Sequence, residues 1–431
     1  MKNLTEVVNT LIHLRQSGKC QITLLAVCPN SEAVLEAAVK AASLNHAPML
    51  FAATLNQVDV DGGYTGWTPK EFVKKIHDFA SKYAWDGALY PCLDHGGPWL
   101  KDRHTLDKLS LDETMNRVKQ SLVACVEAGY SLLHIDPTVD RTLPPDQPIP
   151  LKTVVDRTVE LIAHAERVRN SAQLPPIAYE VGTEEVHGGL VDYARFENFI
   201  DQLHQGLNNA NLSYTWPCFI VAQVGTDLHT TYFDPIAARR LFEKLAPLGS
   251  LVKGHYTDWV ENPAEYPASG MGGANVGPEF TTQEYLALRD LAHKEAALFK
   301  DNHDIVPSNI MGVLKQAVLE SGRWEKWILP GESEDFNLLE PSRQNWLIQT
   351  GSRYIWTNPD VKNARQRLYG NLRNVMIDPH AYVVDRIVES IDKYINQFNS
   401  WEAEQFGKEY FKKPVRYELP GLTIFILQKG G

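Results

Sequence analysis

Three histidines stand just after short apolar segments that alternate with helical patterns. They are His95, His229 and His255. Neutral imidazoles joined by one carboxylate are the ligands that zinc and similar first-row metals prefer. A single histidine in such a position is more often an ordinary polar residue than a ligand. The shared position of all three nevertheless predicts that they converge on one divalent ion.

Several carboxylate side chains also lie at or near the ends of these short apolar segments. The candidates for acid/base catalysis are Asp94, Asp136, Glu180, Glu184 and Asp258. Glu180 or Glu184 could also supply an oxygen ligand to the ion. Asp94 could transfer a proton, or it could cap the next helix or orient a ligand histidine. Because adjacent side chains in a strand diverge, Asp94 and His95 can reach one ligand only if the chain turns, and Gly96-Gly97-Pro98 supplies such a turn.

Further residues are candidates for binding a substrate. They are Asn56, Gln57, Tyr64, Gln223, Gly272, Gly273, Asn275 and Arg353. Tyr64 lies in a Gly-rich segment, 62–66, which is typical of a loop whose backbone approaches a ligand, although a plain turn fits nearly as well. The glycines near 270–277 could hold phosphate or form a simple loop. Arg353 could fold over the site and bind an anion, or pack as ordinary surface.

Eight segments of the chain could form the strands that position these residues. In order they are Ile22–Val27, Met49–Thr54, Ala88–Leu93, Leu132–Ile135, Ile177–Val181, Phe219–Gln223, Leu251–Gly254 and a weaker run around Asn275-Val276. Helical patterns separate them, and near-continuous apolar runs indicate buried parallel strands. This alternation predicts an α/β fold, a TIM (β/α)8 barrel, with its site at the carboxyl ends of the strands. A doubly wound open sheet is the alternative, but no G-x-G-x-x-G motif follows the first strand.

The alternation stops near Lys300. We therefore expect a barrel over 1–300 and a mainly helical C-terminal appendage over 301–431, with a last short strand at Leu422–Leu427. The G-x-x-x-x-G-K-[ST] motif is absent, which disfavours a nucleotide triphosphatase.

Composition narrows the classes of partner and compartment. The 431 residues are 44% hydrophobic, enough for a large core, and 42 basic against 53 acidic residues leave a net charge of −11 that disfavours nucleic acid. No apolar run approaches the roughly 20 residues of a membrane helix. The five cysteines form no C-x-x-C pair, so we expect a reducing, cytoplasmic location.

Several longer motifs carry a family resemblance. They are Asn56-Gln57-Val58, the run 62–69, Asp94-His95-Gly96-Gly97-Pro98, His134-Ile135-Asp136, Pro148-Ile149-Pro150-Leu151, Gly182-Thr183-Glu184, the run 254–258 and Val276-Gly277-Pro278. With these motifs the chain resembles the Z-subunit family of tagatose-1,6-bisphosphate aldolase, which is related to the class II, metal-dependent ketose-bisphosphate aldolases. The resemblance covers most of the chain.

The resemblance implies roles for individual residues. His95, His229 and His255 would bind a divalent metal, zinc first and Mn, Co or Ni as alternatives. Asp94 would be the acid/base beside the sugar hydroxyl, and Glu180 or Glu184 would complete the metal site or act as a second base. The chain departs from the family in having Asn275 where a basic residue is usual, and in the Gly-rich insertion before it.

The resemblance also implies two alternative functions. One is a 4-epimerase that interconverts tagatose 6-phosphate and fructose 6-phosphate, or the free ketoses, by breaking and re-forming the C3–C4 bond. Inversion at C4 would need a second proton carrier such as Asp136, Glu180 or Asp258. The other is a noncatalytic partner that stabilises the catalytic subunit of the aldolase. The expected partners are therefore a ketose or ketose phosphate and an aldolase catalytic subunit. The resemblance is also compatible with a homo-oligomer.

Overall fold

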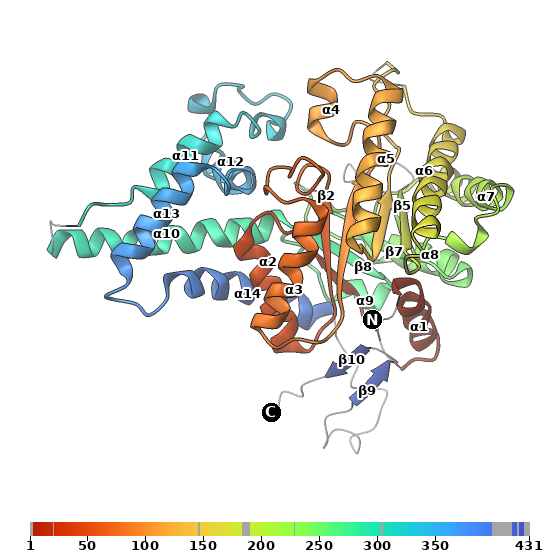
Figure 1. Cartoon of the computed structure of the whole chain (residues 1–431), viewed down its shortest axis with the longest axis horizontal. Helices are drawn as coiled ribbons and strands as arrows, with labels where there is room; N and C mark the ends of the chain where they lie inside the picture. Colours follow the sequence, from red (N-terminus) through yellow and green to blue (C-terminus); the bar gives the residue numbers. More distant parts are fainter. Residues whose placement is uncertain are drawn as a thin grey trace.

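Eight parallel strands close into a barrel in the order of the chain (Figure 1). The computed structural model describes residues 3–19, 21–144, 147–182, 190–227, 229–301, 305–398, 416–419 and 422–425. The barrel strands are β1 (Leu24–Val27), β2 (Met49–Thr54), β3 (Leu89–Gly96), β4 (Leu132–Ile135), β5 (Ala178–Gly182), β6 (Phe219–Val221), β7 (Leu251–Gly254) and β8 (Gly273–Val276). The predicted TIM barrel is confirmed, and the weakly patterned eighth strand closes it by pairing with both β1 and β7.

Helices surround the barrel (Figure 1). Up to the end of the barrel they are α1 (Leu4–Gln16), α2 (Glu32–Asn45), α3 (Pro69–Lys82), α4 (Asp102–Leu106), α5 (Leu111–Ala128), α6 (Leu151–Ser171), α7 (Tyr193–Asn209), α8 (Pro235–Leu245), α9 (Glu265–Ser269) and α10 (Pro278–Asp301). Local signals set several helix starts: Thr68 and Glu71 form a capping box at α3, and Ser110 and Glu113 form another at α5.

The two faces of each strand bury different side chains. Leu25 and Val27 of β1 pack among the residues that face the helices, whereas Leu24 and Ala26 belong to the cluster that fills the inside of the barrel. Strand side chains alternate between the two faces with a period of two. This alternation determines which polar residues enter the barrel.

β3 extends beyond its predicted end at Leu93 and continues to Gly96, with an irregular register against β4. α10 begins at Pro278, where the Asp258 carboxylate accepts hydrogen bonds from the Gly277 and Glu279 N–H groups (2.9 and 2.7 Å). Acidic groups at a helix N-terminus are stabilising, so Asp258 caps this helix.

The chain beyond the barrel is mainly helical, as predicted. It contains α11 (Ile310–Glu320), α12 (Pro341–Gly351), α13 (Pro359–Leu372) and α14 (Pro379–Phe398), followed by an antiparallel pair, β9 (Arg416–Leu419) and β10 (Leu422–Phe425). α14 returns to the barrel and packs against α2 and α10. Its last carbonyl, on Phe398, accepts a hydrogen bond from the Thr23 N–H just before β1 (3.0 Å).

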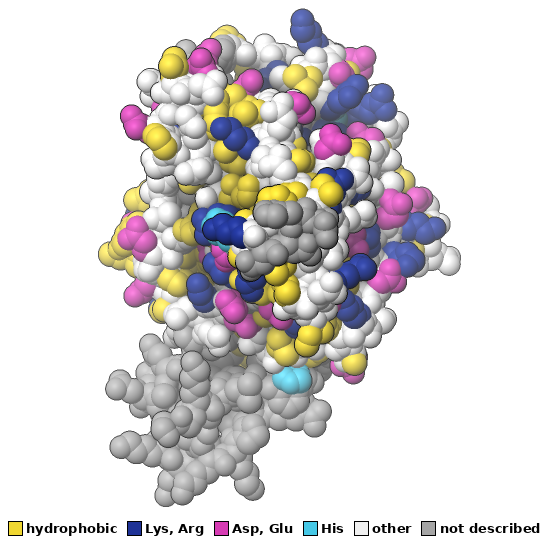
Figure 2. Space-filling view, turned by 90° about the vertical axis from the view of Figure 1, so that its left-hand side faces the viewer, with side chains coloured by type: hydrophobic (Ala, Val, Ile, Leu, Met, Phe, Trp, Pro, Cys, Tyr) yellow, Lys and Arg dark blue, Asp and Glu magenta, His cyan; other side chains and the backbone are white. Residues whose placement is uncertain are grey.

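Charge on the outer part of this helical region is mixed. Figure 2 shows basic, acidic and hydrophobic side chains interspersed over the face that includes the end of α10. Within the described ranges, no helix is long and apolar enough to cross a membrane.

Candidate metal centre

Polar side chains from five strands enter the carboxyl end of the barrel. They are Asp94 on β3, His134 on β4, Glu180 on β5, Lys253 on β7 and Asn275 on β8, with His255 directly after β7. All six are almost fully buried. Each lies at an even spacing along its strand from a residue directed to the inside of the barrel, so the period of two brings these groups together.

His95 reaches the same place by a local break in the strand. By alternation its side chain should point away from the inside, but its backbone adopts a left-handed conformation (φ 51°) where the register between β3 and β4 becomes irregular. Non-glycine residues rarely adopt this conformation. The predicted turn therefore begins at His95 itself. Gly97 follows it closely: a Cβ there would lie 1.8 Å from the Asp136 carbonyl oxygen, so a side chain cannot be accommodated.

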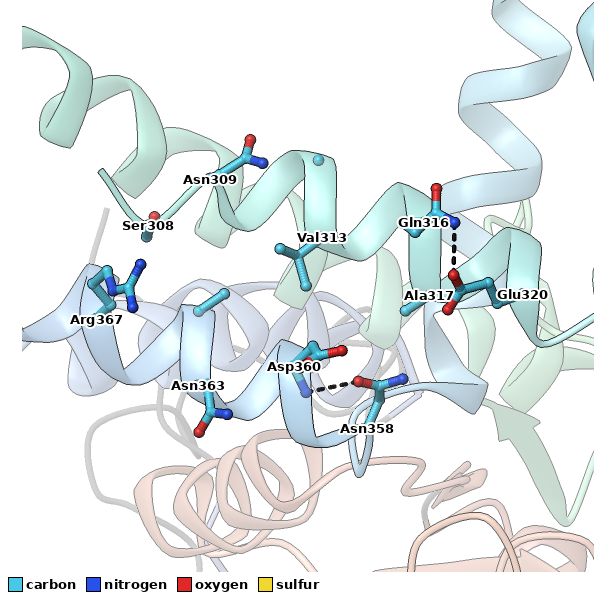
Figure 3. A pocket seen from close by; sticks show the side chains of 12 residues that line it. Ser308, Asn309, Val313, Gln316, Ala317, Glu320, Asn358, Asp360, Asn363 and Arg367 are labelled. Carbon is cyan, nitrogen blue, oxygen red and sulfur yellow. Dashed lines mark hydrogen bonds between the residues drawn. The ribbon is translucent and has the colours of Figure 1, made fainter. Parts of the chain in front are cut away.

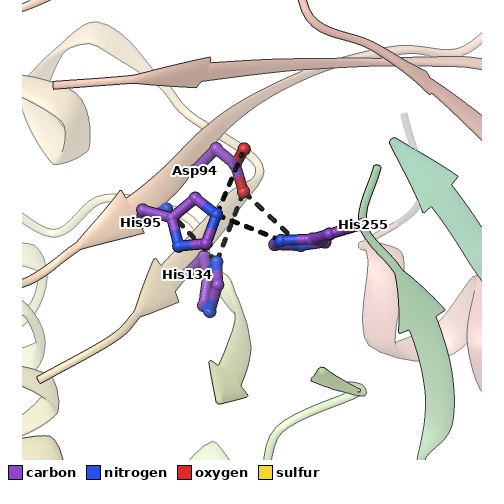
Figure 4. A group of neighbouring side chains, drawn as sticks. All are labelled: Asp94, His95, His134 and His255. Carbon is purple, nitrogen blue, oxygen red and sulfur yellow. Dashed lines mark hydrogen bonds and ion pairs between the residues drawn. The ribbon is translucent and has the colours of Figure 1, made fainter. Parts of the chain in front are cut away.

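Four of these residues form a compact group of potential metal ligands. Asp94, His95, His134 and His255 each offer one atom, and the four atoms lie within 4.8 Å of one another (Figure 4). His255 Nδ1 lies 3.1 Å from His95 Nε2, and His134 Nδ1 lies 3.3 Å from Asp94 Oδ1. Ligand atoms in a tetrahedral zinc site lie roughly 3.3 Å from one another, so these spacings fit a single small ion.

Carboxylates orient two of the three rings. His95 Nδ1 lies 2.5 Å from Asp136 Oδ2, and His255 Nε2 lies 3.2 Å from Glu180 Oε1. Each contact leaves the other ring nitrogen directed toward the group. A carboxylate that holds the far nitrogen of a histidine is the usual arrangement around a metal in proteins, because it fixes the tautomer and the ring orientation. Asp136 and Glu180 therefore occupy orienting positions in this structure.

His134 is the third histidine of the group. Its Nδ1 accepts a hydrogen bond from the His95 N–H (3.2 Å), and its Nε2 is buried with no hydrogen-bond partner among the residues that the structure describes. The nitrogen that faces Asp94 is Nδ1, so this ring enters the group through Nδ1 and not through the unpaired Nε2. His134 is not among the histidines that the sequence predicts as ligands.

Positively charged side chains offset the buried carboxylates of Glu180 and Asp94. Lys253 Nζ binds both carboxylate oxygens of Glu180 (2.9 and 2.8 Å) inside the barrel. Burial acts to raise the pKa of Glu180, but Lys253, His134 and His255 together outweigh burial and lower it to about 2. Burial also disfavours the charged form of Asp94, yet His95 and His255 hold its pKa well below the ordinary value. Both carboxylates are thus ionised at neutral pH.

The pKa values of His255 and His95 are shifted in opposite directions. Burial lowers the pKa of His255 to about 4, whereas Asp94 and Asp136 overcome burial and raise the pKa of His95 to about 9. A divalent ion would displace the proton that these carboxylates hold on His95.

The structure corrects one predicted ligand. His229 does not belong to the group: it is exposed, and its ring lies against Trp346 of α12 at a centroid distance of 5.3 Å. The Asp227 carboxylate accepts a hydrogen bond from the His229 N–H (2.5 Å), which forms a local turn in the loop after β6. This turn carries His229 outward. Glu184, the alternative oxygen ligand, lies outside the described residues.

Asn56 and Gln57 connect loops of the barrel. The Asn56 side chain donates to the Leu100 carbonyl oxygen (3.0 Å) and accepts from the Asp102 N–H (3.0 Å). Gln57 is buried and donates to the Pro29 carbonyl oxygen (3.0 Å). Gln223 is half-buried just after β6. The side-chain amides of Asn56 and Gln57 are thus used within the protein.

The predicted phosphate-binding glycines also need correction. Gly272 and Gly273 are buried at the start of β8, which is the opposite end of this strand from its carboxyl end. A Cβ on Gly273 would lie 3.3 Å from Lys253 Cγ, so the glycine makes room for that lysine. Asn275 donates instead to Asp94 Oδ2 (3.1 Å). The N-terminus of α10, the other expected anion site, is capped by Asp258.

The remaining predicted residues meet at the mouth of the barrel. Tyr64 contacts Tyr354 edge to face, with ring centroids 5.2 Å apart, and its carbonyl oxygen accepts a hydrogen bond from Thr357 (2.9 Å). Arg353 is stacked between aromatic rings in the same region. The segment with Arg353 thus packs against the loop that carries Tyr64, and the binding of an anion by Arg353 stays a prediction.

A separate cavity of about 590 Å³ lies between α11 and α13 (Figure 3). Its lining is mostly small or amide side chains, with Glu320, Asp360 and Arg367 as charged groups. None of the residues of the metal-ligand group lines it. We therefore place the candidate chemistry at the barrel mouth.

The fold and the site define a class: a (β/α)8 barrel with a histidine and carboxylate group, a candidate metal centre, at the carboxyl ends of its strands. Within this class the chain belongs to the family described as D-tagatose-1,6-bisphosphate aldolase subunit GatZ/KbaZ-like, whose model matches residues 8–406.

Individual relatives agree with this assignment. The chain is 28% identical over 400 residues to the D-tagatose-1,6-bisphosphate aldolase subunit GatZ of Escherichia coli O157:H7 (strain EC4115 / EHEC), covering 86% of this chain and 89% of the relative. The GatZ protein of Shigella boydii serotype 18 matches with the same values.

Solved structures share the fold. A probable tagatose 6 phosphate kinase from Sinorhizobium meliloti 1021 superposes with a TM-score of 0.74 at 22% identity, over 87% of this chain and 100% of that one. The fructose-bisphosphate aldolase of Campylobacter jejuni superposes with a TM-score of 0.51 at 11% identity, over 92% and 94% of the two chains. At these identities the likeness concerns the fold alone.

Proposed function

We propose that the chain is a metal-dependent ketose 4-epimerase that interconverts tagatose 6-phosphate and fructose 6-phosphate, or the corresponding free ketoses. The observation that carries this proposal is the group of Asp94, His95, His134 and His255 within 4.8 Å, with carboxylates on the far nitrogens of two rings. The three histidines would hold the ion. Zinc suits this donor set best, and Mn, Co or Ni are alternatives.

The chain's own residues account for the proton transfer. Asp94 is ionised and buried beside the histidines, so it can take the proton of the C4 hydroxyl group. The C3–C4 bond then breaks and leaves an aldehyde at C4. After the aldehyde rotates, C3 attacks its opposite face, the bond re-forms, and Asp94 or a second acid returns the proton. A bound divalent ion supplies Lewis-acid stabilisation of the negative charge that develops on the ketose.

A second function is supported by the comparisons more directly than the first. The relatives at 28% identity are named as aldolase subunits, and the matching family carries the same description. On that basis this chain would stabilise the catalytic subunit of a tagatose-1,6-bisphosphate aldolase without turning over substrate. The buried group of ligands favours the enzyme, because a purely stabilising subunit does not need it.

One experiment separates the two functions. The chain, purified alone, is loaded with zinc or manganese and incubated with fructose 6-phosphate and, in a parallel reaction, with fructose. Tagatose or tagatose 6-phosphate as product supports the epimerase. A metal-loaded chain that is inert on both sugars but raises the activity or the melting temperature of a class II aldolase subunit supports the partner function instead.

A further inference from the structure

Arg353 is a buried cation that forms no ion pair with any residue the structure describes. Its side chain is only 9% exposed, and its Nε and one of its terminal nitrogens have no hydrogen-bond partner within the described part of the chain. No acidic side chain in that part forms an ion pair with it. The guanidinium group lies 4.4 Å from the ring centroid of Trp327 and 5.0 Å from that of Tyr354. The faces of these rings fix its plane, and neither ring's side chain makes a hydrogen bond to its Nε or its unpaired terminal nitrogen.

Burying a guanidinium group without an acceptor is costly, because it loses its hydration and gains only the weaker attraction of the rings. Arginine also presents a rigid fork of donors that matches a phosphate or carboxylate group. Such a residue is therefore expected where a ligand supplies the missing anion.

The surroundings of Arg353 are positively charged. Arg323 lies 4.3 Å and Lys326 5.2 Å from the Tyr354 ring, and both form ion pairs with Asp102. Counted against Asp102, with which two of them pair, the three cations carry a net charge of +2, and Asp258 also lies within electrostatic range of Arg353. Burial acts to raise the pKa of Tyr354, but Arg353, Lys326 and Arg323 outweigh it and lower the pKa below its ordinary value. A phosphate monoester, which carries about −1.5 to −2 at neutral pH, matches this charge better than a single carboxylate does.

This cationic cluster, Arg323, Lys326 and Arg353, lies at the barrel mouth. Trp356 Nε1 donates to Thr281 Oγ1 at the start of α10 (3.0 Å), and Thr357 donates to the Tyr64 carbonyl oxygen in the loop after β2. Cys28 follows β1 directly. Burial and Asp94 raise the pKa of its thiol, and Arg353 lowers it. The chain segment that carries Arg353 is thus attached to the same end of the barrel as the metal-ligand group.

The more usual anion site of a barrel is occupied here. Asp258 caps the N-terminus of α10, and Asn275 stands on β8 where its amide binds Asp94. A phosphate group at α10 would meet the carboxylate of Asp258.

We propose that Arg353, supported by Arg323 and Lys326, binds the phosphoryl group of a ketose 6-phosphate whose reacting carbons lie at the Asp94 and histidine group. This inference rests on the proposed function of that site and specifies its substrate class as the phosphorylated sugar. The arginine selects the phosphate, and the barrel site acts on C3 and C4.

The first test measures binding without turnover. Inorganic phosphate is titrated calorimetrically into the full chain and into Arg353→Gln, with the exposed Arg373→Gln as the matched control. We expect phosphate affinity to fall at least about 10-fold in Arg353→Gln and to stay at the wild-type value in Arg373→Gln. Equal phosphate affinity in all three proteins would overturn the proposal.

The second test measures specificity. The ratio of kcat/KM for fructose 6-phosphate to that for fructose should fall by about 10- to 100-fold in Arg353→Gln. A ratio equal to that of the wild type, with both substrates slowed alike, would overturn the proposal by indicating a structural role.

A third variant guards against misfolding. If Arg353→Gln does not give the circular dichroism spectrum of the folded protein, Arg353→Lys decides, because it keeps the charge and loses the planar fork. Weaker phosphate binding by Arg353→Lys supports the site, and unchanged binding rejects it. If the wild-type chain turns over neither sugar, the proposed epimerase function fails, whereas the phosphate titration still decides on Arg353.

Discussion

At the scale of single residues, the site depends on pairs in which a carboxylate fixes a histidine. Asp136 holds His95 and Glu180 holds His255, while Lys253 compensates the buried charge of Glu180. These contacts direct the other two ring nitrogens, His95 Nε2 and His255 Nδ1, toward each other at 3.1 Å. Asp94 lies beside them, with Asn275 bound to its second oxygen, and is the proposed proton acceptor.

The role of Asp94 can be tested by Asp94→Asn, which keeps the shape of the side chain and removes its basicity. We expect bound metal to be retained and kcat to fall by about 10²- to 10⁴-fold, as for loss of a general base. Metal content and turnover of fructose 6-phosphate are measured together, with the exposed Asp78→Asn as control. An unchanged rate would exclude a proton-transfer role, and loss of metal would assign Asp94 as a ligand.

The orienting role of Asp136 leads to a separate expectation. Asp136→Asn weakens the contact that fixes the His95 tautomer, so metal affinity should fall by about 10- to 100-fold without loss of the fold. Competition with a chromogenic chelator measures the affinity. Asp107→Asn, an exposed aspartate paired with Arg103, should leave it unchanged. Wild-type affinity in Asp136→Asn would show that this carboxylate does not support the ligand.

At the scale of elements, strand alternation explains most of the site. His134 stands two positions after Leu132, which faces the inside of the barrel, so the sequence Leu-Leu-His-Ile contained the signal for a third inward histidine. His134 was not predicted because it lies inside its apolar run, whereas most of the predicted site residues lie at the ends of the runs. By contrast, the left-handed backbone of His95 and the outward turn at His229 follow from loop geometry, which has no period to read from the sequence.

The same reasoning explains which parts of the fold were predictable. Seven strands were visible as apolar runs, whereas β8 gave only a weak signal because Gly273 and Asn275 interrupt its apolar run. The cap of α10 could not be predicted, because Asp258 is distant in sequence from the start of this helix. The position of α14 against α2 is likewise a tertiary contact without a local sequence signal.

The contact between α14 and α2 should depend on pH. His380 Nε2 lies 2.8 Å from Glu36 Oε2. This contact raises the pKa of His380 above 6.5. His380 and Lys82 outweigh burial and lower the pKa of Glu36 to about 2. The histidine therefore stabilises the fold fully below pH 6.5 and loses its effect as the pH rises through its folded-state pKa. The glutamate stabilises above its ordinary pKa of 4.5 and loses its effect as the pH falls toward 2.

The penalty of His380→Gln should accordingly be larger at pH 6 than at pH 9. Urea denaturation at both values gives the free energy of unfolding of variant and wild type. The exposed His77→Gln provides the control, with no such difference expected. A penalty for His380→Gln that is the same at both pH values would show that the charged pair does not stabilise this contact.

At the scale of the whole molecule, the barrel presents its site at one end, and the C-terminal helices add the segment with Arg353 to that end. The family relationship leaves two whole-molecule functions, catalysis and stabilisation of a partner. These functions make different use of the metal-ligand group, because only catalysis requires it.

This difference can be measured by co-expression with a class II tagatose-bisphosphate aldolase catalytic subunit. If the chain is a stabilising partner, it should raise the melting temperature of that subunit by mass action, and His255→Ala should do so equally well. If the chain is only an enzyme, no shift should occur with either protein. A shift that is present with the wild type and lost with His255→Ala would contradict a purely structural partner function.

The central claim is that His134, and not His229, is the third histidine around one divalent ion. The most direct measurement is the zinc content of purified wild-type, His134→Ala and His229→Ala proteins by mass spectrometry, after dialysis against a weak chelator. We predict one zinc ion per chain in the wild type and in His229→Ala, and almost none in His134→Ala. Zinc retained by His134→Ala and lost from His229→Ala would contradict the account.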